Sequence, residues 1–190
     1  MRTYQLENIL GLQDPCTRRS FLGVFPSDIH VTPRRKKEFI VFNLDGHLLE
    51  GSHWVAVVLE KKKKKHYQGE YFDSFGRRPQ NINIIKYLNK YCKKNWTWNT
   101  RQVQHKFEDT CGHHVIYYLN QKCLGYSLKY ITRRLLTRRP NPDTFVTNFI
   151  NDNNIISSFA KTCWNLLYNK VYKGNIKCII KEMYNKGNVK

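Results

Sequence analysis

The sequence has few acidic residues and no long apolar run. Its 14 Asp and Glu stand against 33 Lys and Arg, which gives a formal net charge of +19. So many positive charges repel one another unless an anion binds to the surface, so nucleic acid is the first partner to consider. The longest apolar stretch, Trp54 to Leu59, is far shorter than the ~20 residues that cross a bilayer, so we expect no membrane span.

Regularly spaced cysteines and a secretory leader are also missing. The cysteines stand at positions 16, 92, 111, 123, 163 and 178, with no Cys-x-x-Cys pair. A structural zinc site is therefore not expected, and we predict reduced thiols, most of them small buried residues. Residues 1–12 interrupt their apolar positions with Arg2, Gln5, Glu7 and Asn8, which differs from a signal peptide and predicts an intracellular protein.

A hydrophobic content of 41% with only 10 Gly and 6 Pro in 190 residues is typical of one globular domain over residues 1–190. Apolar spacing predicts helices and β-branched, aromatic runs predict strands. Residues 53–60 are almost wholly apolar, which indicates a central strand covered on both faces. The predicted strands are 38–43, 53–60, 67–75 and 96–103, and the predicted helices are 4–11, 82–91, 111–123, 127–137 and most of 143–190. The sum is an α+β fold with a central, mostly antiparallel sheet flanked by helices.

Cys111 stands at the predicted start of a helix. Thr110 is the expected N-cap and Gly125 the expected stop. A helix N-terminus and a nearby imidazolium lower a thiol pKa, which favours the nucleophilic thiolate. Gly112 follows without a side chain, so a substrate backbone could approach closely. The segment is typical of a nucleophile, although a core cysteine at a helix start fits it equally.

The loop Lys61 to Lys65 joins two predicted antiparallel strands. Its position indicates which histidine could act as the general base for Cys111. If the loop is centred on Lys63, Glu60 pairs with His66 and His53 lies directly opposite Asp73. Directly opposed residues are close enough for a carboxylate to hold an imidazole in one tautomer. With Cys111 they would form a Cys-His-Asp triad. A β-bulge would shift this register.

Gln104 stands seven positions before Cys111 and offers a side-chain amide for an oxyanion. A competing interpretation is a metal site made of Cys111, His113, His114 and perhaps His105. Adjacent histidines on a helix point about 100° apart, so they do not readily face one ion. We therefore expect no bound metal.

These motifs resemble those of a known family. His53-Trp54, the segment Tyr71 to Gly76 with Asp73, Val103-Gln104 and Cys111-Gly112 are similar, in this order, to the motifs of the adenovirus proteinase (adenain) family. Phe21 to Phe25 and Asn141-Pro142 also resemble that family. The likeness covers most of residues 6–160, while 161–190, which we expect to form a helical extension, are less similar.

The resemblance implies a papain-like arrangement in reversed chain order, with the Cys111 helix packed against the sheet that bears His53 and Asp73. It implies an endopeptidase that cleaves viral precursor proteins at Gly-containing motifs during virion maturation, in the virion and the host nucleus. Asp73 stands where mammalian adenovirus enzymes commonly have Glu.

The resemblance also implies activators. No small-molecule cofactor is expected, but family members are stimulated by DNA and by a viral peptide joined through a cysteine. Cys92 is the nearest candidate for that cysteine, although it ends a predicted helix. The candidate DNA contacts are Lys61, Lys62, Lys63, Lys64 and Lys65, with further basic clusters at 34–37, 133–134 and 138–139.

Two alternatives remain. The same motif order marks the wider group that includes ubiquitin-like-protein proteases, so a folded protein is also a possible substrate. A non-catalytic nucleic-acid-binding protein would explain the charge. It leaves the ordered His53, Asp73, Gln104 and Cys111 unexplained.

Overall fold

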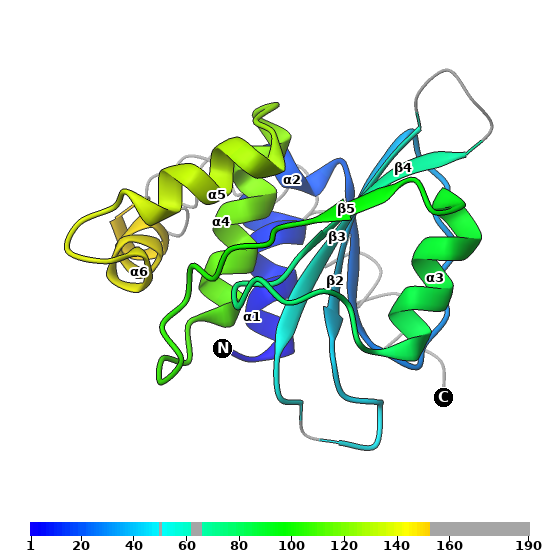
Figure 1. Cartoon of the computed structure of the whole chain (residues 1–190), viewed down its shortest axis with the longest axis horizontal. Helices are drawn as coiled ribbons and strands as arrows, with labels where there is room; N and C mark the ends of the chain where they lie inside the picture. The colour runs from blue at the N-terminus through cyan, green and yellow to red at the C-terminus, as the bar shows by residue number, and fades with distance from the viewer. Residues whose placement is uncertain (50, 62–65, 153–190) are drawn as a thin grey trace, which may run out of the picture.

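The computed structural model describes residues 1–49, 51–61 and 66–152. In this part of the chain a five-stranded sheet lies between α3 (Ile82–Cys92) on one side and the other helices on the opposite side (Figure 1). The elements in chain order are α1 (Thr3–Glu7), the π-helical η1 (Asn8–Gln13), α2 (Pro15–Arg18), β1 (Phe21–Pro26), β2 (Lys37–Asn43), β3 (Trp54–Lys61), β4 (Tyr67–Phe72), α3 (Ile82–Cys92), β5 (Trp96–Trp98), α4 (Cys111–Cys123), α5 (Leu128–Leu136) and α6 (Pro142–Asp152).

The strands follow one another across the sheet in the order β1-β2-β3-β4-β5. The central pairs, β2 with β3 and β3 with β4, are antiparallel. The outer pairs, β1 with β2 and β4 with β5, are parallel. The predicted α+β class with a sheet flanked by helices is confirmed, and the antiparallel prediction holds for the three central strands.

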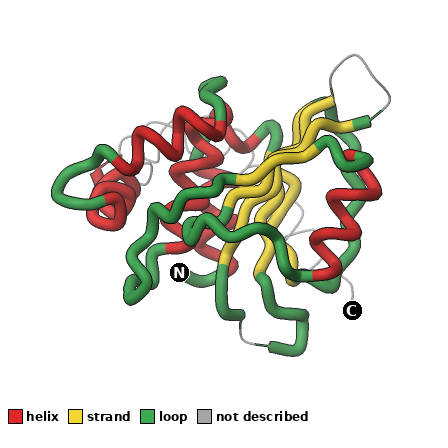
Figure 2. The backbone as a smooth tube through the Cα atoms, in the orientation of Figure 1, coloured by secondary structure: helices red, strands yellow, loops and turns green. Residues whose placement is uncertain are grey.

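β3 is central and buried on both faces, as its apolar run predicted. Its alternating side chains enter two separate cores, since successive residues of a strand point to opposite faces. Trp54, Ala56 and Val58 pack with residues of α1 and α4, whereas Val55, Val57 and Leu59 pack with residues of α3. Figure 2 shows α3 alone on one side of the sheet and the other helices on the opposite side.

Several predicted elements differ in extent, among them the strand expected over 67–75, which ends at Phe72. Segment 4–11 forms α1 and then continues as the π-helical η1. The strand expected over 96–103 ends at Trp98. β1 was not predicted, because its sequence contains Gly23 and Pro26, two residue types that are atypical of strands. In the structure Gly23 has a φ of +148°. Of the helices expected over 143–190, α6 is confirmed. The helical extension predicted for residues 161–190 lies outside the described residues. The prediction of one domain over residues 1–190 is therefore not tested for that segment.

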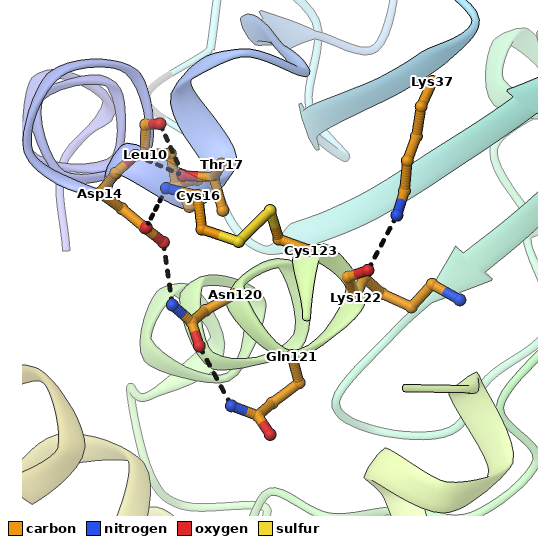
Figure 3. The surroundings of a disulfide bond; sticks show 9 residues. All are labelled: Leu10, Asp14, Cys16, Thr17, Lys37, Asn120, Gln121, Lys122 and Cys123. Atoms are coloured by element: carbon orange, nitrogen blue, oxygen red, sulfur yellow. Dashed lines mark hydrogen bonds between the residues drawn. A yellow bond between two sulfur atoms is a disulfide. The ribbon is translucent and has the colours of Figure 1, made fainter. Parts of the chain in front are cut away.

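Cys16 and Cys123 form a disulfide, so the prediction of reduced thiols is wrong for this pair. Their separation of 107 residues gives no local signal, but α2 packs on the C-terminal end of α4 and brings the Cα atoms to 5.8 Å. Figure 3 shows Asn120 on α4 donating a hydrogen bond of 3.0 Å to buried Asp14 beside this disulfide. Tertiary packing therefore decides the pairing.

Within the described ranges, none of the helices has the length and apolar character needed to cross a membrane.

Candidate active site

His53 and Asp73 form a buried pair at one end of β3 and β4. His53 Nε2 lies 2.7 Å from Asp73 Oδ1, and the residues are 9% and 1% exposed. The same carboxylate oxygen accepts the backbone N–H of Phe75 at 2.9 Å. The ring of Phe75 packs on the imidazole with a centroid distance of 4.9 Å. The contacts fix the ring plane and leave Nδ1 for another partner.

The predicted strand register is wrong, although the predicted contact exists. Glu60 pairs with Gln68 rather than with His66, because the ladder continues to a pair between Lys61 and Tyr67. The register is therefore displaced by two residues, and His53 lies diagonal to Asp73 instead of directly opposite. A displacement of two preserves the alternation of side chains along a strand, so the two side chains still meet.

Asn99 holds the backbone of Asp73 in place. Its Oδ1 accepts the Asp73 N–H at 2.9 Å and its Nδ2 donates to the Asp73 carbonyl at 2.6 Å. These bonds replace the ladder that β5 would have made if it had continued past Trp98. Sequence reasoning missed Asn99, since a single Asn in an expected strand carries no signal of its own.

Cys111 joins this pair from the opposite side. It opens α4, which packs against β3, and its thiol is hydrogen-bonded to the His53 imidazole. The backbone N–H groups of Trp54 and Gly112 also donate to the sulfur. The Trp54 donor could not be inferred from the sequence, because it depends on how the start of α4 meets β3. The side chains of Cys111, His53 and Asp73 thus form one connected set.

Electrostatics in this set favour an ion pair. Burial by itself raises the pKa of the Cys111 thiol, but the hydrogen bonds from His53 and the two backbone N–H groups outweigh it and lower the pKa. Burial by itself lowers the pKa of His53, but the hydrogen bonds to Asp73 and Cys111 raise it to about 9. These shifts favour a thiolate beside an imidazolium over a neutral thiol beside a neutral imidazole.

Gln104 is buried beside the turn that follows Asp73. Its backbone N–H donates to the Ser74 carbonyl at 3.1 Å, and its Oε1 accepts the Ser74 hydroxyl at 2.5 Å. Its Nε2 donates to the Glu108 carbonyl, which uses one of its two amide protons. The second proton remains for another acceptor. Ser74 is thus a further residue that orients this amide.

Met1 lies against the start of α4. The Trp54 indole donates to the Met1 carbonyl at 3.1 Å. A Cβ added to Gly112 would come within 2.9 Å of the Met1 sulfur. The space that we expected a substrate backbone to use beside Gly112 is therefore occupied by Met1 in this conformation.

Other predicted site residues lie apart from this set. Cys92 is fully buried at the end of α3, in the core on the opposite face of the sheet, and burial raises its pKa to about 12. Lys61 ends β3, while Lys62, Lys63, Lys64 and Lys65 lie outside the described residues. Of the histidines considered as metal ligands, His114 instead bonds to Asp143. Over the ranges described, no group of three or more His, Cys, Asp or Glu side chains could hold a metal ion.

Comparison with known proteins gives likenesses to solved structures only, and we describe one of them. No family model matches the sequence, and none of the curated proteins matches it. A solved structure, titled as the crystal structure of the Se-Met ASFV pS273R protease, matches with a TM-score of 0.45 and 17% sequence identity. The match covers 62% of this chain and 44% of that chain, so it spans less than half of the solved protein.

Proposed function

We propose that this chain is a cysteine endopeptidase with Cys111 as nucleophile and His53 as general base. The observation that carries the proposal is the connected set of Cys111, His53 and Asp73, in which the thiol pKa is lowered and the imidazole pKa is raised. A structural cysteine has no need of a buried imidazole and a carboxylate behind it. This combination is what nucleophilic catalysis by a thiolate requires.

In the proposed mechanism, the Cys111 thiolate attacks the carbonyl carbon of the scissile peptide bond. The oxyanion that forms accepts from the backbone N–H of Cys111 and from the free amide proton of Gln104. The His53 imidazolium gives its proton to the leaving amine, and a water molecule, deprotonated by His53, then hydrolyses the thioester. Asp73 holds the imidazole in orientation through the 2.7 Å contact at Nε2.

The substrate assignment rests on the resemblance of the motifs to the adenovirus proteinase family. It favours precursor proteins cut at Gly-containing motifs over ubiquitin-like proteins. A thiol-reactive probe on a Gly-containing peptide should label wild-type Cys111 and should not label Cys111→Ala. A peptide library that includes segments ending in Gly-Gly then ranks the two substrate classes. Equal labelling of both proteins, or uncut libraries, would overturn the endopeptidase proposal.

DNA binding is a second proposal, supported by the net charge of +19. Not every basic residue is available for it. Lys37 donates to the Lys122 carbonyl at 2.9 Å, and Arg138 packs on the Phe145 ring. Arg34, Lys36, Arg133 and Arg139 are exposed. Together with the cluster Lys61 to Lys65, which the charge pattern of the sequence predicts, they are the candidates for phosphate contacts.

Salt dependence tests the DNA proposal. If the protein neutralises several phosphates of duplex DNA, log K should fall with log salt at about −0.9 per contact, whatever the base sequence. Replacing Lys61 to Lys65 by Gln should flatten this slope and reduce any stimulation of cleavage by DNA, while basal cleavage stays near normal. Wild-type binding without salt dependence would exclude the proposal.

A peptide activator is the weaker extension of the family resemblance. A peptide joined at Cys92 would need the end of α3 to open, because Cys92 is completely buried and its thiol pKa is raised. Thiol labelling of Cys92 in the native protein, compared with the unfolded protein, measures that opening.

A further inference from the structure

Asp143, at the start of α6, makes three hydrogen bonds to the chain around the candidate nucleophile. Its Oδ1 accepts from the Thr110 hydroxyl and, at 3.0 Å, from His114 Nε2. Its Oδ2 accepts the backbone N–H of His105 at 2.9 Å. The residue is 5% exposed, and α6 packs against α4. Both carboxylate oxygens are therefore committed to these partners.

The partners lie at both ends of one loop. His105 directly follows Gln104, and Thr110 directly precedes Cys111. His114 lies on the first turn of α4, where its backbone N–H donates to the Thr110 carbonyl. One carboxylate thus fastens both ends of the loop 105–110, which connects the proposed oxyanion donor to the proposed nucleophile.

The side chain of Thr110 has no other role at this helix start. Thr110 occupies the N-cap position of α4, but it makes no side-chain capping hydrogen bond. Its hydroxyl points instead to Asp143. The expected capping role is therefore replaced by a tertiary contact 33 residues along the chain.

The carboxylate is ionised under ordinary conditions. Burial by itself raises the pKa of Asp143, but the hydrogen bonds from His114, Thr110 and the His105 backbone outweigh it and lower the pKa. A charged acceptor forms the stronger kind of hydrogen bond with each of these donors.

We propose that Asp143 is a positioning residue of the active site, which sets the placement of Cys111 relative to Gln104 and His53 by holding both ends of the loop 105–110. This inference rests on the proposed function. It assigns a role in the site to α6, an element that contributes none of the reacting groups. Since a misplacement of about 1 Å can cost ~10²-fold in rate, a clamp of this kind has a kinetic consequence.

Thr110→Val tests the clamp with little change of shape, because it removes the hydroxyl and keeps the branched side chain and all charges. Thr110→Ser keeps the hydroxyl and serves as the rescue variant. Asp143→Ala removes all three contacts and should have the larger effect. Glu70→Gln is the matched control, since Glu70 also bonds to α4, through Lys122 Nζ at 2.9 Å and the Tyr118 hydroxyl at 2.8 Å, but near the opposite end of that helix.

The first measurement needs no substrate. Iodoacetamide labelling of Cys111 at pH 7, followed by mass spectrometry of the tryptic peptide 107–122, reports the reactivity of this thiol, which is the only cysteine of that peptide. We expect labelling about tenfold slower in Thr110→Val than in wild type, and near wild-type rates in Thr110→Ser and Glu70→Gln. On a cleaved peptide, kcat should fall about tenfold in Thr110→Val with KM nearly unchanged.

Unchanged labelling and unchanged kcat in folded Thr110→Val would overturn the clamp. Faster labelling in Thr110→Val would also overturn the clamp, because loss of a positioning contact should make Cys111 less reactive and not more. If the wild type cleaves no peptide but its Cys111 labels fast and slows in Thr110→Val, the clamp stands and the endopeptidase proposal fails. If Asp143→Ala does not fold, Thr110→Val alone decides.

Discussion

The two ends of α4 are held in different ways. At its N-terminal end, Cys111 is placed by hydrogen bonds from His53 and two backbone N–H groups, and Thr110 by a hydrogen bond to Asp143. At its C-terminal end, Cys123 is joined covalently to Cys16, and Lys37 donates to the Lys122 carbonyl at 2.9 Å. The N-terminal end is held by hydrogen bonds, whereas the C-terminal end is anchored covalently as well.

The difference follows the helix dipole. A helix N-terminus favours negative charge and a C-terminus favours positive charge, so a thiolate at Cys111 and the ammonium of Lys37 each lie at the end that stabilises them. Lys122 at the same end adds an ion pair of 2.9 Å with Glu70. We therefore expect substitutions at the N-terminal end of α4 to change the reactivity of Cys111, and substitutions at its C-terminal end to change the stability of the fold.

The largest effect is expected at the reactive end. His53→Ala should lower kcat by about 10⁴-fold, nearly as much as Cys111→Ala, because the Cys111 thiol loses its proton acceptor and the leaving amine loses its proton donor. Asp73→Asn should cost less, about 10²-fold, because it leaves the base in place and removes only its charged partner. Steady-state cleavage of one peptide by the three variants measures this order. A wild-type rate in Asp73→Asn would show that the 2.7 Å contact has no role in catalysis.

Gln104→Ala should lower kcat by about 10²–10³-fold and leave KM nearly unchanged, because an oxyanion donor acts in the transition state and not in substrate binding. Ser74→Ala should give a smaller loss of the same kind, since the Ser74 hydroxyl only orients the amide through Oε1. Separate kcat and KM values check both. A change confined to KM would reassign Gln104 to substrate binding.

The pH dependence of cleavage should have a high alkaline limit. The pKa of His53 is raised to about 9, so the imidazolium persists below that pH and is lost as the pH rises through it. The lowered pKa of Cys111 keeps the thiolate until the pH falls through that value. The profile of kcat/KM should therefore fall on the alkaline side near pH 9, and Asp73→Asn should move this limb to lower pH. If the alkaline limb of the profile stays at the same pH in Asp73→Asn, that limb does not reflect the deprotonation of His53.

The smallest effect on activity is expected at the anchored end. The double variant Cys16→Ser with Cys123→Ser should lower the free energy of unfolding by about 2–4 kcal/mol, because the disulfide closes a long loop in the unfolded chain. Its kcat, measured well below the melting temperature, should stay within about twofold of the wild type. A drop in kcat comparable to that of Gln104→Ala would show that the two ends of α4 are coupled, and the contrast between them would be lost.

Local patterns in the sequence were sufficient for the main elements and for the members of the candidate site. The apolar run 54–59 indicated a strand buried on both faces, and the helical stripe after Cys111 placed the start of α4. His53 and Asp73 were expected to meet on adjacent strands, and they do. Such predictions succeed because burial of a strand and the start of a helix depend on residues that are neighbours in the chain.

Only the tertiary structure decided which distant groups complete the site. The register between β3 and β4 depends on where the ladder ends, and it is displaced by two residues from the expected pairing. The disulfide joins residues 107 positions apart, and the hydrogen bond between Thr110 and Asp143 joins residues 33 positions apart. These contacts are set by how α2 and α6 pack against α4. A residue pattern within one segment cannot specify such packing, because it depends on side chains from several segments at once.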